Sequence, residues 1–297
     1  MPNSLTTFCR KFLAAWLLSR PAALVTGAKG MLGQDLCPML EKAGYTVIKT
    51  DVDNMDITNF ENVKSVISKE KPDIIVHCAA YTNVDKAEED MKTARLINST
   101  GTENVAKICG ENDITMVYIS TDYVFAGDKK EAYLPDDKTN PINNYGLTKL
   151  EGELAVQKYC SKYFIARTSW LYGLYGKNFV ETMLSLADKP ELKVVNDQVG
   201  CPTWTVELAE GILKLLKTKK YGIYHVCGSG QTSWYEFAKE IFKQANLNVN
   251  LKPCTTEEFP RLAKRPLCSV MFNNNICRDW KEALKDYFKL RENKEKL

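Results

Sequence analysis

A tyrosine and a lysine four positions apart, Tyr145 and Lys149, are the residues best placed by their spacing to transfer a proton. The segment that follows, 146–159, is predicted to be a helix, and residues i and i+4 share one helix face. A nearby ammonium favours the phenolate and lowers the pKa of a tyrosine from its usual value of about 10. The pair could serve as a general acid or base near neutral pH, although an isolated match is also common on ordinary surface helices.

A glycine-rich turn lies near the start of the chain. The apolar run 23–26 is followed by Gly27, Gly30 and Gly33, then by an amphipathic segment, 34–43, and by a second strand-like run, 45–50. Glycines let the backbone turn tightly and approach a pyrophosphate, and the next helix presents free N–H groups to its charge. This order predicts a dinucleotide site, although the spacing G-x-x-G-x-x-G differs from G-x-G-x-x-G. A glycine turn without a ligand is the alternative.

An aspartate, Asp51, closes the second of these runs. An acidic residue at this distance from the glycines can bind the ribose hydroxyls of a dinucleotide, and it repels a 2′-phosphate. Lys29 in the glycine turn could offset that repulsion. The cofactor is therefore predicted to be NADH or NADPH, with NADH slightly favoured.

Hydroxyl residues end the buried run that begins at Met116. In an open parallel sheet the ligand crevice lies beyond the carboxyl ends of the strands, so Ser120 and Thr121 are expected at its rim. A hydroxyl there can contact both a carbonyl oxygen and the Tyr145 phenol. The alternative is a turn in which these residues cap the next segment, and it fits Ser120 better than Thr121.

Strand-like and helix-like segments alternate along the first half of the 297 residues. This order predicts an α/β fold with a doubly wound parallel sheet (Rossmann) and a smaller, discontinuous α/β substrate domain. The expected organisation is an N-terminal extension or leader (1–21), a dinucleotide-binding domain (22–170) and a mainly substrate-binding part (171–297) with segments that return to the first domain. A long helix is expected over 91–112.

Composition excludes several classes of protein. The net charge is +3, and basic and acidic residues are interspersed along the sequence, so no clustered basic face for binding nucleic acid is expected. Ten cysteines without a C-x-x-C pair, and only two histidines, predict no metal site. Free thiols suggest a reducing cytoplasm, and the apolar run 12–18 is too short to cross a bilayer. We therefore expect a cytoplasmic protein without a membrane partner.

Several longer motifs resemble the extended short-chain dehydrogenase/reductases that act on nucleotide sugars, and within them the dTDP-4-dehydrorhamnose reductases. The resemblance covers roughly residues 22–290. Besides the glycine turn and the tyrosine–lysine pair, its marks are the segments 78–88, 120–125, 167–170, 176–179, 195–198 and 264–266. The connection between Pro266 and Trp280 is shorter than such reductases usually have, which puts the edge of the substrate domain and its dimer contacts in doubt.

The resemblance implies that NAD(P)H reduces the C4 keto group of dTDP-4-dehydro-L-rhamnose to give dTDP-L-rhamnose. Tyr145 would donate the proton, Lys149 would hold the nicotinamide ribose, and Thr121 would orient the carbonyl. The cofactor would contact Gly27, Gly30, Met31, Leu32, Gly33, Asp51, Asp56, Ile57, Ala79, Ala80, Tyr81, Tyr145 and Lys149. The dTDP-sugar would contact Thr121, Asp122, Trp170, Asn178 and Arg265.

Two alternatives stay open at this point. Another nucleotide-sugar epimerase or reductase of the extended family would share the same triad. A dehydratase would need a glutamate after the aspartate of its Asp-Glu pair, and this chain has Tyr123 there. A non-enzymatic regulatory subunit, resembling the β subunit of methionine adenosyltransferase, would share the fold. The sequence does not decide whether the chain forms a homodimer.

Overall fold

The computed structural model describes residues 20–295, and most of the predicted extension over 1–21 lies outside this range. Six parallel strands form the central sheet in the order β10-β5-β4-β3-β1-β2. The strands are β1 (Ala22–Thr26), β2 (Thr46–Lys49), β3 (Ile74–His77), β4 (Thr115–Thr121), β5 (Tyr163–Thr168) and β10 (Gly222–His225). The predicted doubly wound parallel sheet is confirmed.

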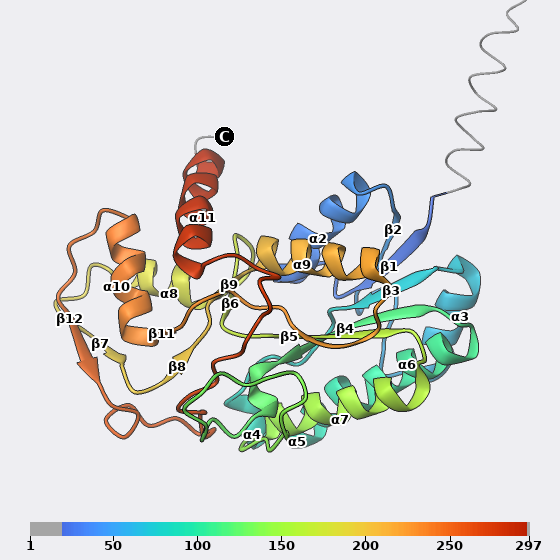
Figure 1. Ribbon diagram of the computed structural model, residues 1–297, viewed down its shortest axis with the longest axis horizontal. Helices are drawn as coiled ribbons and strands as arrows, with labels where there is room; N and C mark the ends of the chain where they lie inside the picture. The colour runs from blue at the N-terminus through green and yellow to red at the C-terminus, as the bar shows by residue number, and fades with distance from the viewer. Residues whose placement is uncertain (1–19, 296–297) are drawn as a thin grey trace, which may run out of the picture.

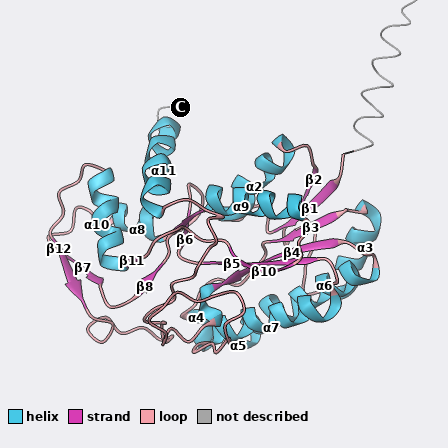
Figure 2. Ribbon diagram, viewed as in Figure 1, coloured by secondary structure: helices cyan, strands magenta, loops and turns pink. Residues whose placement is uncertain are grey.

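Helices cover both faces of this sheet, as Figures 1 and 2 show. One face packs against α2 (Met31–Lys42) and α9 (Thr205–Thr218) through a core that includes Val25, Val117 and Ala166. The other face packs against α3 (Phe60–Glu70), α6 (Thr102–Glu111) and α7 (Asn144–Tyr159). Because strand side chains alternate between faces, neighbouring residues at a strand end point to different layers.

A second lobe lies beside the sheet, to the left in Figure 1. It contains α8 (Phe179–Ser185), α10 (Trp234–Gln244) and α11 (Trp280–Glu295), which enclose an aromatic core around Tyr172, Phe237 and Tyr287. Short strand pairs complete it: β6 (Leu171–Tyr172) with β9 (Thr203–Trp204), β7 (Leu192–Val195) with β12 (Leu251–Cys254), and β8 (Val199–Gly200) with β11 (Thr232–Ser233). The predicted smaller, discontinuous lobe is therefore present, because β10 and α9 return to the sheet between its segments.

The long helix expected over 91–112 is interrupted. Residues after α4 (Lys86–Glu89) form α5 (Met91–Arg95), a π-helical turn (Leu96–Gly101) and then α6. The π-helical turn carries Asn98, whose side chain is fully buried and bonds both the N–H and the C=O of Tyr81 (2.8 and 3.0 Å). Such π-helical turns are frequent at functional sites.

A buried ion pair fixes α7 against the sheet. Glu153 (0% exposed) accepts hydrogen bonds from Arg167 on β5 (2.7 and 2.9 Å) and from the Ser120 hydroxyl on β4 (2.6 Å). Tyr145, Lys149 and Glu153 are spaced by four residues and share one face of α7, whose N-terminus is capped by Asn143. The ion pair therefore positions the tyrosine and the lysine as well.

We predict that Glu153→Ala destabilises the protein by about 3 to 5 kcal/mol, because it leaves the Arg167 charge buried without its partner. Thermal and urea unfolding would measure the loss. Glu151→Ala is the matched control: it lies on the same helix and pairs with the more exposed Arg95, so its loss should stay below about 1 kcal/mol. Similar losses for the two variants would contradict the role given to the buried pair.

Candidate active site

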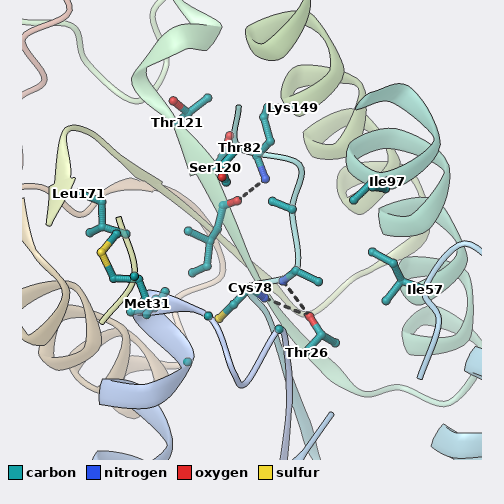
Figure 3. A pocket seen from close by; sticks show the side chains of 18 of the residues that line it. Thr26, Met31, Ile57, Cys78, Thr82, Ile97, Ser120, Thr121, Lys149 and Leu171 are labelled. Carbon is teal, nitrogen blue, oxygen red and sulfur yellow. Dashed lines mark hydrogen bonds between the residues drawn. The ribbon is translucent and has the colours of Figure 1, made fainter. Parts of the chain in front are cut away.

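A cavity of about 1020 Å³ lies at the carboxyl edge of the sheet and extends to the second lobe. The ends of β1, β3, β4 and β5, the glycine turn, and the segment after β5 contribute to its wall. Figure 3 shows side chains from these elements facing one another across it. This is the place at which open α/β sheets bind their ligands.

The glycine turn leaves no room for side chains. Gly27 has a φ of +62°, and a Cβ there would lie 2.9 Å from the Ala79 backbone. A Cβ on Gly33 would lie 2.5 Å from the Gly27 carbonyl oxygen. Gly30 precedes the first turn of α2, whose N–H groups and positive dipole end face the cavity rim. The backbone therefore forms the cradle that a pyrophosphate requires.

Asp51 lines the cavity beyond the glycine turn, as expected. Its carboxylate accepts hydrogen bonds from the backbone N–H of Lys29 (3.0 Å) and of Val52 (2.9 Å). The Lys29 ammonium instead pairs with Asp53 (2.7 Å), so it is engaged away from Asp51. Asp56 and Ile57 also line this end of the cavity.

Sequence analysis missed a hydrogen-bonded chain below the cavity. The Thr26 hydroxyl accepts the N–H groups of Cys78 and Ala79 (3.1 Å each), as Figure 3 shows, and donates to Nδ1 of His77 (2.8 Å). The Thr102 hydroxyl donates to the Asn98 carbonyl (2.7 Å) and therefore accepts from Nε2 of His77 (3.2 Å). This leaves Nδ1 as the acceptor for Thr26. Burial lowers the pKa of His77 to about 3, so the ring is neutral. This chain fixes the turn that carries Ala79 and Ala80 along the cavity.

The tyrosine and the lysine of α7 both line the cavity. Burial raises the pKa of the Tyr145 phenol well above its usual value, while the Thr121 side chain acts in the opposite direction. The sequence-based expectation that Lys149 lowers this pKa is wrong here, because desolvation dominates the shift and the carboxylate of Asp122 adds to it. The phenol is therefore protonated at neutral pH, which is the form that a proton donor needs.

Lys149 is almost completely buried (2% exposed). Its ammonium donates to the Ile119 carbonyl (2.6 Å), as Figure 3 shows, and lies 4.1 Å from the centre of the Tyr118 ring. Burial lowers its pKa to about 7, and the Glu153 carboxylate partly offsets this. The ammonium is thus held at one place beside the end of β4.

Thr121, the last residue of β4, is joined through Asp122 to the C-terminal segment. The Thr121 hydroxyl donates to Asp122 (3.0 Å) and accepts the N–H of Tyr123 (3.2 Å). Asp122 also accepts the Ser269 hydroxyl (2.5 Å), and burial raises its pKa to about 6. The connection between Pro266 and Trp280 therefore runs against the end of β4 and helps to hold Asp122.

The expected sugar-binding residues divide into two groups. Thr121, Asp122 and Trp170 line the cavity, and the Trp170 ring stacks on Trp234 at 3.5 Å. Asn178 is not among the lining residues: it caps α8 and donates to the Gly173 carbonyl (2.8 Å). Arg265 is also absent from the lining, because it pairs with Asp85 (2.9 Å) and donates to the Tyr123 hydroxyl (3.3 Å).

Tyr81 is also absent from the lining, although Ala80 and Thr82 on either side of it line the cavity, and its backbone is held by Asn98. The other expected cofactor residues, Gly27, Gly30, Met31, Leu32, Gly33, Asp51, Asp56, Ile57, Ala79, Ala80, Tyr145 and Lys149, all line the cavity. Within residues 20–295 no cluster of His, Cys, Asp or Glu could hold a metal ion. No helix in the described range is long and apolar enough to cross a membrane.

We predict that Gly33→Ala weakens dinucleotide binding by about tenfold or more, which corresponds to about 1.4 kcal/mol of strain. The added methyl would press on the Gly27 carbonyl and on Ala28 and widen the cradle. Titration with NADH, followed by quenching of tryptophan fluorescence, would measure the affinity, and circular dichroism would verify the fold. Unchanged affinity in a folded variant would show that α2 does not need this close approach.

The comparisons with known proteins agree with this arrangement. The family model "RmlD substrate binding domain" matches residues 22–292. The spore coat polysaccharide biosynthesis protein SpsK of Bacillus subtilis (strain 168) is 42% identical, over 90% of this chain and 97% of that protein. A solved dTDP-4-dehydrorhamnose reductase from Clostridium acetobutylicum ATCC 824 is 46% identical, with a TM-score of 0.89, over 91% of this chain and 99% of that one.

A second solved dTDP-4-dehydrorhamnose reductase, from Bacillus anthracis str. Ames in complex with NADP, is 44% identical with a TM-score of 0.89 and the same coverage of both chains. The match to the family model covers nearly all of the described residues. The chain therefore belongs to the RmlD substrate-binding domain family.

Proposed function

We propose that this protein is an NAD(P)H-dependent reductase that converts the C4 keto group of dTDP-4-dehydro-L-rhamnose to a hydroxyl, giving dTDP-L-rhamnose. The observation that carries the proposal is the half-buried Tyr145 and the buried Lys149 beside Thr121, in a cavity that begins at the glycine turn. Similar solved proteins are named dTDP-4-dehydrorhamnose reductase, and one of them holds NADP.

The residues around the glycine turn fit a dinucleotide. Gly27, Gly30 and Gly33, with Met31 and Leu32 of α2, would hold the pyrophosphate, since glycine at 27 and 33 lets the turn pack closely on Ala79 and on the start of α2 and leaves the backbone N–H groups free to face the ligand. Asp51 would bind the adenosine ribose, with Asp56 and Ile57 beside the adenine. Ala79, Ala80 and Tyr81 would lie along the middle of the cofactor. When bound, NAD(P)H supplies the hydride.

Tyr145 would donate its proton to the oxygen that becomes the C4 hydroxyl. Because burial keeps the phenol protonated, the donor is ready before the carbonyl is reduced. Lys149 would hold the nicotinamide ribose and stabilise the phenolate that remains, since its ammonium lies fixed on the same helix face. Thr121 would orient the carbonyl oxygen.

The sugar nucleotide would occupy the side of the cavity that faces the second lobe. Asp122 and Trp170 line that side directly. Asn178 and Arg265 would contact the sugar nucleotide only after leaving their present partners. For Arg265, this means breaking the ion pair with Asp85 to reach the diphosphate. We assign 22–170 to the dinucleotide-binding domain and 171–297 mainly to the substrate-binding domain, with β10 and α9 returning to the first.

Tyr145→Phe should lower turnover by on the order of 10²-fold or more, because the general acid is lost, while NADPH affinity stays close to that of the wild type. Consumption of NADPH with the dTDP-keto sugar, read at its absorbance band, is the measurement. Tyr163→Phe is the control and should keep full activity, because Tyr163 begins β5 and the cavity lies at the other end of that strand. Wild-type turnover in Tyr145→Phe would remove the phenol from the reaction. No turnover by the wild-type protein would favour the regulatory-subunit alternative.

Asp51 would give a modest preference for NADH over NADPH, since its carboxylate repels a 2′-phosphate. Asp51→Ala should therefore weaken NADH binding more than NADPH binding, so that the dissociation constant of NADH divided by that of NADPH increases. Fluorescence titrations with both cofactors give this ratio. An unchanged ratio would mean that Asp51 serves the turn at Lys29 and Val52 rather than the ribose.

A further inference from the structure

One buried hydroxyl in the cavity wall lacks a protein partner. Within residues 20–295, the side-chain groups that are buried and without a hydrogen bond include those of Thr168, Tyr172, Trp204 and His225. Of these four, Thr168 is the one that lines the cavity. Buried polar groups are almost always paired, so an unpaired one at a ligand site calls for an explanation.

The neighbouring hydroxyls are all engaged with the protein. Ser120 donates to Glu153, Thr121 to Asp122, and Ser169 to the Cys201 carbonyl (2.6 Å). Thr26, at the end of β1, donates to His77. The fold thus satisfies the other strand-end hydroxyls named here and leaves Thr168 available.

The register of the sheet sets the direction of the Thr168 side chain. Thr168 pairs with Thr121 across the parallel strands β5 and β4, so both side chains lie on the same face of the sheet. The preceding residue, Arg167, points to the opposite face, where it meets Glu153. Thr168 therefore stands beside Thr121, one strand further along the cavity.

The order of the strands indicates which ligand meets this hydroxyl. Consider a dinucleotide with its adenosine at Asp51 on the β2 side and its pyrophosphate at the turn after β1. Its nicotinamide end would then reach the catalytic triad of Thr121, Tyr145 and Lys149 at the end of β4. β5 lies beyond the triad, next to Trp170 and the second lobe. We propose that the Thr168 hydroxyl hydrogen-bonds a hydroxyl of the sugar next to its keto carbon. This inference rests on the proposed reductase function.

The chemistry of the group agrees with this assignment. A threonine hydroxyl both donates and accepts, and its short side chain is held still by burial (7% exposed). Such a group recognises a neutral partner that also donates and accepts, which a sugar hydroxyl does. The nicotinamide carboxamide is the other neutral polar group of the reacting pair, so the test has to separate the two.

The test compares Thr168→Val, which removes the hydroxyl at nearly constant shape, with Thr168→Ser, which keeps it. Thr203→Val is the matched control. Thr203 is also fully buried, but its hydroxyl donates to the Cys201 carbonyl (3.3 Å) and accepts the N–H of Gly228 (3.1 Å). For each variant, KM for the dTDP-keto sugar, kcat, the dissociation constant of NADPH and Tm are measured.

In Thr168→Val we expect KM for the keto sugar to rise by roughly five- to tenfold, the effect of one lost hydrogen bond, with NADPH affinity unchanged. Its Tm should hold or rise, because an unpaired buried hydroxyl has been replaced by a methyl. Thr203→Val should lose Tm with little change in KM, and Thr168→Ser should keep a near wild-type KM. A threonine with only a structural role would not give a higher KM for the sugar together with an unchanged or higher Tm.

An unchanged KM in Thr168→Val, or a fall in Tm like that of Thr203→Val, would overturn the inference. Weaker NADPH binding with an unchanged KM for the sugar would overturn it in favour of the carboxamide. Failure of the proposed function would look different: the wild-type protein itself would not consume NADPH with the keto sugar.

Discussion

The buried ion pair between Arg167 and Glu153 is the constraint on which the site depends. Two charges with 2% and 0% of their side chains exposed can be tolerated only when each satisfies the other. That requirement admits one placement of α7 on β4 and β5, with Ser120 as the third member of the group. Lys149 and Tyr145 then follow from helix geometry alone, about one and two turns from Glu153 toward the edge of the sheet. The pair is better understood as fixing the register of α7 than as a net source of stability, since buried ion pairs often contribute little beyond an apolar replacement.

Desolvation, which the ion pair helps to enforce, also sets the protonation states in the cavity. Burial raises the pKa of Tyr145 and lowers those of Lys149 and His77. Each shift favours the neutral form of its own group, while the wall of the cavity also contains acidic and basic side chains, among them Lys29, Asp51 and Lys177. Hydrogen bonds within such a low-dielectric site are stronger than in water and need no rearrangement when a ligand arrives. A protonated phenol beside a fixed ammonium is then suited to donate a proton once negative charge develops on a substrate oxygen.

Local spacing predicted the parts of the site that depend on local geometry. The glycine turn, the tyrosine–lysine pair and the alternation of strands and helices are properties of short segments, and the structure has them where expected. The positions of the Arg265 and Asn178 side chains could not be predicted from local spacing. Arg265 pairs with Asp85, which lies 180 positions away in the sequence, and Asn178 caps its own helix. The direction of the Tyr145 pKa shift depends on burial, which spacing does not report. Thr168 could be identified only from the register of β4 and β5 and from the absence of a partner in the described residues.

The discontinuity of the second lobe follows from the same geometry. Its C-terminal segment returns to the end of β4, where Ser269 bonds Asp122, and Arg265 reaches the Tyr123 ring that lies edge-on to Tyr145 (5.8 Å). A ligand that displaced Arg265 from Asp85, or altered the protonation of Asp122, would thus act within one or two side chains of the proposed proton donor. The C-terminal segment thus makes both of these contacts at the turn that follows β4. The return of the chain between the lobes therefore connects the C-terminal segment, through Tyr123, to the helix that carries Tyr145.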